Sequence, residues 1–236
     1  MGKFLDADGL KQVWDTAKGT FVKKEEGKGL SSNDFSDEWK KKIEDLAYVP
    51  MAIASFTNNV NVAEMGSTVE RVTFNWSLNK SPKSQKVDSQ VVEASLRTLV
   101  LTGQQIKTDK TFTLSATDER DKTVTKTTTI RFYNGVYWGI GNAGQEVDSA
   151  FILSLSKGLQ ASKGKKPFTV NAGENEHIFY AVPSRYGTCM FNVGGFDGGF
   201  SKVTTFDFVN ASGFKESYDV YKSTNDNLGS TTVTVK

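Results

Sequence analysis

Histidine and cysteine are the residue types that most often carry nucleophilic or metal chemistry, and this chain has one of each, His177 and Cys189. A cysteine thiol becomes a catalytic nucleophile when a neighbouring base or positive charge lowers its pKa. A His177–Cys189 dyad is therefore one hypothesis, and a buried structural cysteine is the hypothesis we favour. One histidine and one cysteine also leave a tetrahedral zinc site incomplete unless carboxylates or other subunits complete it. A lone cysteine forms no intrachain disulfide.

Carboxylates occur close together in two places. Glu174 and Glu176 could act as an acid and base pair, but acidic residues beside glycine and asparagine more often lie in solvated loops. The segment 118–122 carries three acids that resemble a cation-binding cluster, although it lacks the EF-hand spacing and its two basic residues balance part of the charge. We expect a hairpin turn there and no metal site.

The segment Gly194–Phe200 is rich in glycine, as a phosphate-binding loop would be, but it matches neither nucleotide-binding pattern. We expect a glycine-rich connection in which Phe196 and Phe200 pack. Six aromatic side chains could form a sugar-stacking platform, and we favour core packing for each: Tyr137, Trp138, Tyr180, Tyr186, Tyr218 and Tyr221. The sequence thus predicts no catalytic residue, no metal site and no cofactor, and we expect that the protein is not an enzyme.

The length and composition of the chain limit how many domains it can form and which classes of protein it can belong to. A chain of 236 residues and 25.9 kDa allows roughly two or three compact units. The 29 basic and 27 acidic side chains give a net charge of +2 and are spread evenly, so nucleic-acid binding is disfavoured. The N-terminus has no apolar run of signal-peptide length, and no later run could span a membrane. We therefore expect synthesis in a cytoplasm, without membrane insertion or lipidation.

Residues 1–47 carry two short helical patterns. The first consists of apolar residues along one helix face: Leu10, Val13, Trp14, Ala17 and Phe21. The second consists of Trp39, Ile43, Leu46 and Ala47, with Ser36 as the expected N-cap. Helices this short are marginal alone. We predict that they anchor and trimerise the protein through Leu10, Val13, Trp14, Phe21, Trp39, Ile43 and Leu46. The alternative is that both helices fold back on the following domain.

Residues 48–134 change to period-2 patterns rich in valine, threonine and serine. In 69–78 the apolar residues Val72, Phe74, Trp76 and Leu78 share one face, which predicts a half-buried strand. Further strands are predicted over 96–101, 110–117 and 124–132. Short strands at such intervals with one central tryptophan indicate an immunoglobulin-like or fibronectin-like β-sandwich.

Residues 135–236 concentrate the aromatic residues and glycines, as a compact β-rich domain with irregular loops requires. We expect one helix over 148–159, with Phe151, Ile152 and Leu155 facing inward. Strands are predicted over 168–171, 178–182, 189–193, 203–209, 215–221 and 231–235. The predicted fold is therefore mainly β: a short N-terminal helical anchor (1–47), an immunoglobulin-like sandwich (48–134) and a C-terminal β-rich knob with one helix (135–236).

Several phrases of the chain have a counterpart in one group of viral proteins. Residues 5–10 with Trp14, then Gly27–Ser36 followed by Lys41-Lys42-Ile43, resemble a leader found on tail and fibre proteins of bacteriophages and prophages of gut bacteria. The leader phrase there is K-G-L-S-T-N-D-[YF]-[TS], followed by K-x-K-[LI]. Here Ser32 replaces the usual threonine and Phe35 the commoner tyrosine. Three later phrases look like the end domain of such fibres: residues 181–187, 193–200 and 218–223.

This resemblance implies a virion structural protein, commonly a homotrimer, with the leader towards the particle and the end domain towards solvent or the host cell. The resemblance implies no catalytic residues in this chain. We expect a tail fibre or appendage subunit, located in the virion and contributing to host attachment, whose partners are its own copies, other virion proteins and a host surface glycan. Two alternatives stay open: a head fibre or capsid decoration protein, and a carbohydrate-binding module.

Overall fold

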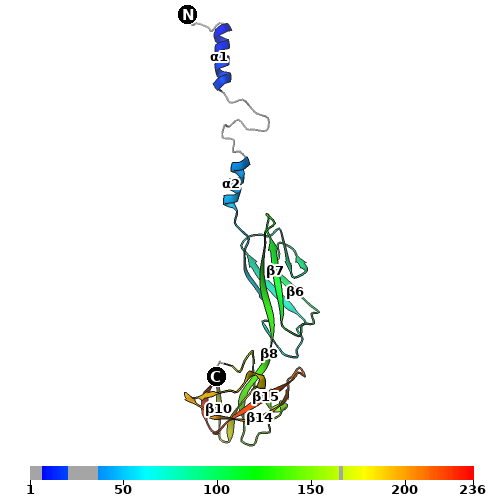
Figure 1. The fold of residues 1–236 in the computed structure, drawn as a ribbon, viewed down its shortest axis with the longest axis vertical. Coiled ribbons are helices and arrows are strands. Elements are labelled where there is room, and N and C mark those ends of the chain that lie inside the picture. The colour runs from blue at the N-terminus through cyan, green and yellow to red at the C-terminus, as the bar shows by residue number, and fades with distance from the viewer. Residues whose placement is uncertain (1–6, 21–36, 165–166) are drawn as a thin grey trace. The chain divides into compact units, whose positions relative to one another are not determined.

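The computed structural model describes residues 7–20, 37–164 and 167–236. It divides into two compact units, Met1–Pro50 and Met51–Lys236. The first unit contains the helices α1 (Ala7–Thr20) and α2 (Asp37–Ala47), shown in Figure 1. Both occur where the apolar periodicity predicts them. Asp8 in the first turn of α1 and Lys18 in its last turn complement the helix dipole. Ser36, the expected N-cap of α2, and Phe21 lie outside the described residues.

The second unit begins with an immunoglobulin-like β-sandwich over residues 53–133, called the sandwich below. One sheet has the strand order β1-β3-β6, and the other has the order β5-β4-β7-β8. The short strand β2 pairs in parallel with β8. The bounds are β1 (Ile53–Asn58), β2 (Val62–Glu64), β3 (Val72–Leu78), β4 (Ser84–Val87), β5 (Gln90–Val92), β6 (Thr98–Leu101), β7 (Lys110–Thr117) and β8 (Thr123–Asn142).

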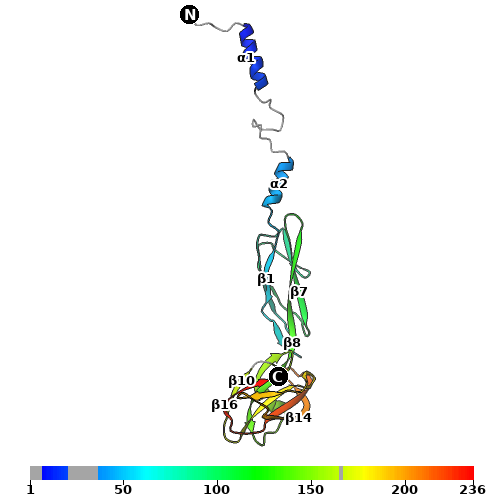
Figure 2. The same cartoon turned by 60° about the vertical axis from the view of Figure 1, so that its left-hand side comes forward.

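The chain crosses repeatedly between these two sheets. It passes from β3 to β4, from β5 back to β6, and from β6 to β7, so that β3 pairs with β6 and β4 pairs with β7 although other strands lie between them in the sequence. This is the A-B-E and C-F-G arrangement of immunoglobulin-like domains. Figure 2 shows β1 and β7 in the two opposing sheets. The prediction of a mainly β chain with such a sandwich is confirmed.

The core of the sandwich follows the predicted alternation. Strand β3 buries the side chains of Val72, Phe74 and Trp76. The residues between them face outward. Phe74 meets Phe112 of the opposite sheet with ring centroids 4.7 Å apart. The Trp76 indole N–H donates to Gln85 Oε1 at 3.0 Å. These contacts between the sheets fix their packing, because a buried indole N–H needs an acceptor.

Strand β8 has 20 residues and belongs to both β domains. Residues 123–130 pair with β7, and residues 137–142 pair with β11 (Glu176–Pro183). The predicted strand 124–132 therefore ended too early. Gly135, Gly139 and Gly141 interrupt the alternation in the second half of β8, which hides the strand from a pattern search. The predicted domain boundary after residue 134 falls inside β8.

The C-terminal domain, residues 134–236, packs two sheets and one α-helix. The larger sheet has the order β14-β15-β11-β8, with β9 paired on β8, and the smaller sheet has the order β10-β16-β12-β13. The remaining elements are α3 (Ser149–Ser154), β9 (Ser156–Gln160), β10 (Phe168–Ala172), a 3-10 helix (Ser184–Tyr186), β12 (Phe191–Val193), β13 (Phe196–Asp197), β14 (Phe200–Val209), β15 (Lys215–Ser223) and β16 (Gly229–Val235).

Strand β11 is buried on both faces. Ile178, Tyr180 and Val182 face the smaller sheet in one hydrophobic cluster. Phe179 and Ala181 face the opposite way, towards the side covered by α3. A strand covered on both faces is a continuous apolar run rather than an alternating one. This accounts for the unbroken run of apolar residues from Ile178 to Val182.

The helix predicted over 148–159 is wrong in its second half. Helix α3 ends at Ser154, and residues 156–160 form β9, antiparallel to β8. The edge of β8 offers backbone hydrogen bonds to this segment, and Gly158 is a poor helix former. Asp148 caps α3, since its Oδ1 accepts the Phe151 N–H at 2.7 Å. The expected inward residues Phe151, Ile152 and Leu155 do pack in one cluster.

Candidate functional site

Helix α1 carries apolar side chains on an exposed face. Leu10, Val13 and Trp14 are exposed, with Trp14 at 61% of its full accessible surface. The Lys18 ammonium lies 5.3 Å from the centroid of the Trp14 ring, a cation–π contact that covers part of the indole. A helix of 14 residues gains most of its stability from packing an apolar face. The exposed face therefore offers an interaction surface.

Helix α2 has the same character. Trp39 is 57% exposed and Leu46 is 87% exposed, and Ile43 between them is also exposed. The Lys42 ammonium lies 4.6 Å from the Trp39 ring centroid. Of the seven residues predicted to form the interface, six are thus exposed apolar side chains of α1 and α2, and the seventh, Phe21, lies outside the described residues.

The two residues considered for a catalytic dyad have other partners. His177 Nδ1 lies 2.9 Å from the Ser223 carbonyl oxygen. Cys189 is buried, and its backbone N–H donates to the Tyr221 hydroxyl at 3.1 Å. Burial raises the pKa of the Cys189 thiol to about 11, whereas a nucleophilic cysteine needs a lowered pKa. The structure therefore matches the hypothesis of a structural cysteine.

The carboxylate groups also have structural partners. Glu176 Oε2 accepts the Gly173 N–H at 2.8 Å, which closes the turn before β11. Asp118 is fully buried at the hairpin between β7 and β8, and its Oδ1 accepts the backbone N–H groups of Arg120 and Lys122, both at 2.9 Å. The predicted hairpin turn is confirmed. Among the described residues, no cluster of three histidine, cysteine or acidic side chains could hold a metal ion.

The glycine-rich segment 194–200 differs in part from the prediction. Phe200 does pack, stacked on Phe191 with ring centroids 4.2 Å apart. Phe196 does not, because it lies on the two-residue edge strand β13 and is 81% exposed. Tyr137, Tyr180, Tyr218 and Tyr221 are buried, as expected for core residues, whereas Trp138 and Tyr186 are only half-buried.

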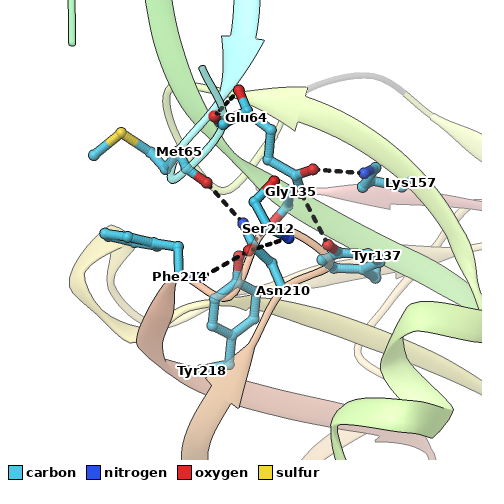
Figure 3. A network of polar contacts seen from close by, with 10 residues as sticks. Glu64, Met65, Gly135, Tyr137, Lys157, Asn210, Ser212, Phe214 and Tyr218 are labelled. Carbon is cyan, nitrogen blue, oxygen red and sulfur yellow. Dashed lines mark hydrogen bonds and ion pairs between the residues drawn. The ribbon is translucent and has the colours of Figure 1, made fainter. Parts of the chain in front are cut away.

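The junction between the sandwich and the C-terminal domain contains a polar network (Figure 3). Glu64, at the end of β2, reaches two side chains of the C-terminal domain. Its Oε1 accepts the Tyr137 hydroxyl at 3.2 Å, and its Oε2 lies 2.9 Å from the Lys157 ammonium. Burial raises the pKa of Tyr137, and the charge of Glu64 raises it further. The phenol therefore stays protonated and can act as the donor.

Asn210 forms the second part of this junction. Its Nδ2 donates to the Met65 carbonyl oxygen at 2.8 Å, and its Oδ1 accepts the backbone N–H groups of Ser212 and Phe214 at 2.9 and 3.0 Å. Gly66 has a positive φ of 86°, and a Cβ there would lie 2.4 Å from Phe214 Cβ. Only glycine allows the two chain segments to approach this closely. Together with the shared strand β8, these contacts join the two β domains.

Asp219 on β15 is a buried carboxylate held by three donors. Its Oδ1 accepts the hydroxyls of Ser184 at 2.8 Å and Thr205 at 2.7 Å, and its Oδ2 lies 3.4 Å from the Lys202 ammonium. Burial opposes ionisation, but the hydrogen bonds from Thr205 and Ser184 and the charge of Lys202 outweigh it, so the pKa of Asp219 is lowered. Asp219 thus stabilises the domain in its ionised form.

The contacts of this junction are absent from the sequence-based predictions, which named only Tyr137 among its residues. Glu64 and Lys157 are 93 positions apart, and Asn210 and Met65 are 145 apart. A local motif search has no way to pair such residues. The local sequence shows only that Glu64 follows two apolar residues at the end of β2, which does not identify its partners.

Comparison with known proteins gives no match to a family model and none to a curated protein. Among solved structures, the chain is similar to the crystal structure of the N-terminal eight Ig domains of Down Syndrome Cell Adhesion Molecule, isoform 1.30.30. The two chains are 10% identical with a TM-score of 0.24, and the match covers 78% of this chain and 26% of that one. This chain thus spans about a quarter of that structure. In the described ranges, no helix is both long and apolar enough to cross a membrane.

Proposed function

We propose that this chain is a structural subunit of a bacteriophage virion, in the form of a tail fibre or similar appendage. In this proposal residues 1–47 anchor the subunit to the particle and trimerise it. Residues 48–134 form a spacer, and residues 135–236 form the terminal knob that contributes to host attachment. The sequence resemblance to phage fibre leaders and end domains supports the class of protein.

The observation that carries the proposal is the pair of exposed apolar faces on α1 and α2. Leu10, Trp14 and Ala17 follow one another at intervals of four and three residues, and Trp39, Ile43 and Leu46 repeat the same intervals. This is the spacing of the seam in a coiled coil, in which copies of one helix bury each other's apolar residues. A second copy of the chain therefore fits both faces.

The burial of these faces contributes energy of the size that assembly requires. Trp14 and Trp39 are each a little more than half exposed, so burying the rest of a side chain of roughly 200 Å² contributes about 3 kcal/mol at about 25 cal/mol per Å². Six such rings in a trimer contribute about 18 kcal/mol, of the same order as the cost of two association steps at about 4–15 kcal/mol each. The helices, marginal alone, would then be stabilised by assembly.

The joined β domains support the role of a spacer that carries a terminal knob. Because β8 runs through both domains and Glu64 and Asn210 bridge them, the knob would keep its orientation relative to the spacer. A fibre that presents an attachment surface benefits from a fixed junction, since a flexible one would lose entropy when several copies bind together.

The direct test is the protein content of virus particles. Particles released from the cells that encode this chain are purified and analysed by peptide mass spectrometry, and then labelled with antibodies against residues 135–236 for electron microscopy. We expect peptides of the chain in the particles and label at the outer end of a fibre. Recovery of the chain only from the cell lysate, and never from intact particles, would contradict the proposal.

A head fibre or capsid decoration protein is the alternative within the same class. Such a protein would also need an anchor to the particle and an exposed end domain. A tail fibre and a head fibre therefore differ here only in their location on the particle. Label that surrounds the capsid, rather than the tail, would assign the subunit to the head.

A further inference from the structure

A pocket of about 560 Å³ opens in the C-terminal domain beside strands β8, β9 and β10. Its walls include three aromatic rings, one glycine and two polar side chains: Trp138, Phe168, Tyr180, Gly158, Gln160 and Ser162. This volume lies in the range of about 300–1,000 Å³ that is usual for small-molecule sites. Nothing in the proposed role of α1 and α2 requires such a pocket.

The aromatic wall is a stack of three rings. The ring centroids of Trp138 and Phe168 lie 5.6 Å apart with an interplanar angle of 28°, and those of Phe168 and Tyr180 lie 5.7 Å apart with an angle of 6°. Phe168 and Tyr180 are buried core residues, but Trp138 is only half-buried. The stack thus begins in the core and ends on an indole that reaches the pocket.

Gly158 makes room for this indole. It lies on β9, opposite Val136 of β8, and a Cβ at this position would lie 3.2 Å from Trp138 Cη2. A side chain at position 158 would therefore require the indole to shift by a few tenths of an ångström. The close approach of ring and backbone shapes the pocket wall around Trp138.

The polar side of the pocket is fixed by hydrogen bonds from the domain core. The Tyr186 hydroxyl donates to the Gln160 carbonyl oxygen at 2.7 Å, and the Tyr180 hydroxyl donates to the Lys163 carbonyl oxygen. The Lys163 ammonium donates to the Thr188 carbonyl oxygen at 2.7 Å. The segment that carries Gln160 and Ser162 is therefore held in place, and a preorganised wall reduces the entropy lost on binding.

We propose that this pocket binds one neutral sugar ring of a glycan. The apolar C–H face of a sugar ring suits the electron-rich face of an indole, and the sugar hydroxyls suit the amide of Gln160 and the hydroxyl of Ser162. This inference stands independently of the assembly proposed for α1 and α2.

The test uses the full chain and four neutral probes: methyl glucoside, methyl galactoside, methyl mannoside and N-acetylglucosamine. Binding is followed by ligand-observed saturation-transfer NMR, and the affinity is measured by titration. We expect at least one probe to bind with a Kd of about 1–10 mM, the range of a single weakly held ring. Absence of a saturation-transfer signal for all four probes at about 10 mM would overturn the proposal.

Variants locate the binding. Trp138→Ala and Gln160→Ala should each weaken binding by about tenfold or more, and thermal melts show whether the domain remains folded. Gln160→Ala leaves the aromatic stack intact, so it keeps the test valid if Trp138→Ala unfolds. The matched controls are Phe196→Ala, which removes an exposed aromatic ring of the same domain, and Gln145→Ala. Binding that is unchanged in both pocket variants, or equally weakened in both controls, would contradict the assignment. So would binding of indole with no binding of any sugar.

Discussion

Glu64 and Lys157 form a 2.9 Å ion pair that joins the last residue of a sandwich strand to strand β9 of the C-terminal domain. The Glu64 side chain is largely buried, and the same carboxylate accepts the Tyr137 hydroxyl. An ion pair with one largely buried partner that also accepts a hydrogen bond is harder to replace by water than a pair exposed on both sides. The two β domains therefore depend on each other at this point.

Replacing Glu64 should weaken the junction. We expect Glu64→Gln to lower the free energy of unfolding by about 1–2 kcal/mol, because the charged partner of Lys157 is lost in a partly buried place. Urea denaturation measures this loss. The control is Asp197→Asn, which removes the exposed pair of Asp197 and Lys236, 3.0 Å apart, and should lower the free energy of unfolding much less than Glu64→Gln does. Equal losses in the two variants would show that the junction pair contributes no more to the free energy of unfolding than an exposed ion pair does.

A change on the apolar face of α1 should disrupt assembly. Trp14→Glu places a charge in the proposed seam, and we expect it to raise the dissociation constant of the trimer at least about tenfold. Gln12→Glu introduces the same residue on the opposite side of the helix and should leave the constant unchanged. Sedimentation velocity over a concentration series measures both. If the two variants behaved alike, the α1 face would have no part in assembly.

The lowered pKa of Asp219 predicts a pH dependence of stability. A carboxyl group with a folded-state pKa below its ordinary value of 3.8 contributes stability above pH 3.8, and this contribution is lost as the pH falls through the folded-state pKa. Asp219→Asn should therefore be less stable than the natural chain at neutral pH, by about 1–3 kcal/mol.

The difference in stability between the natural chain and Asp219→Asn should shrink below pH 3.8. Thermal melts over a range of about pH 7 to about pH 2.5 measure this difference. Asp207→Asn serves as the control, because the pair of Asp207 and Lys215 is exposed on both sides. A difference between the natural chain and Asp219→Asn that stayed constant down to the acid end would refute the role of the ionised carboxylate.

Burial and the pKa of about 11 for Cys189 predict an unreactive thiol. At neutral pH we expect no reaction with a thiol reagent such as Ellman's reagent in the native chain, and full reaction after denaturation. Met190→Cys is a sensitive control, because it adds a thiol at the next position, where the side chain is 64% exposed. Rapid labelling of native Cys189 would reopen the hypothesis of a functional thiol.

The sequence predicts elements well where one face is buried and the other is solvated. The alternation in 69–78 yields β3, and the run 110–117 yields β7 with the same bounds. The two helices also follow from periodicity, since each presents one apolar face. In these cases the pattern that folds the element is local, so it can be read from neighbouring residues.

The prediction was wrong where distant pairing outweighed local preference. Residues 156–160 continue a helical pattern but form β9, because the edge of β8 supplies backbone partners. Phe196 was expected to pack, but a two-residue edge strand leaves it exposed. The contacts of Glu64 with Lys157 and of Asn210 with Met65 join segments that no short pattern connects. Of the candidate site, the exposed helix faces were therefore predictable and the junction and the pocket were not.

The mass of the full-length chain in solution tests the central claim most directly. Sedimentation equilibrium of the purified protein should give three times the monomer mass of 25.9 kDa, with tryptophan fluorescence that shows Trp14 and Trp39 shielded from a soluble quencher. A protein that remains monomeric at the highest concentrations, with both tryptophans accessible to the quencher, would contradict the proposal that these helices assemble the subunit.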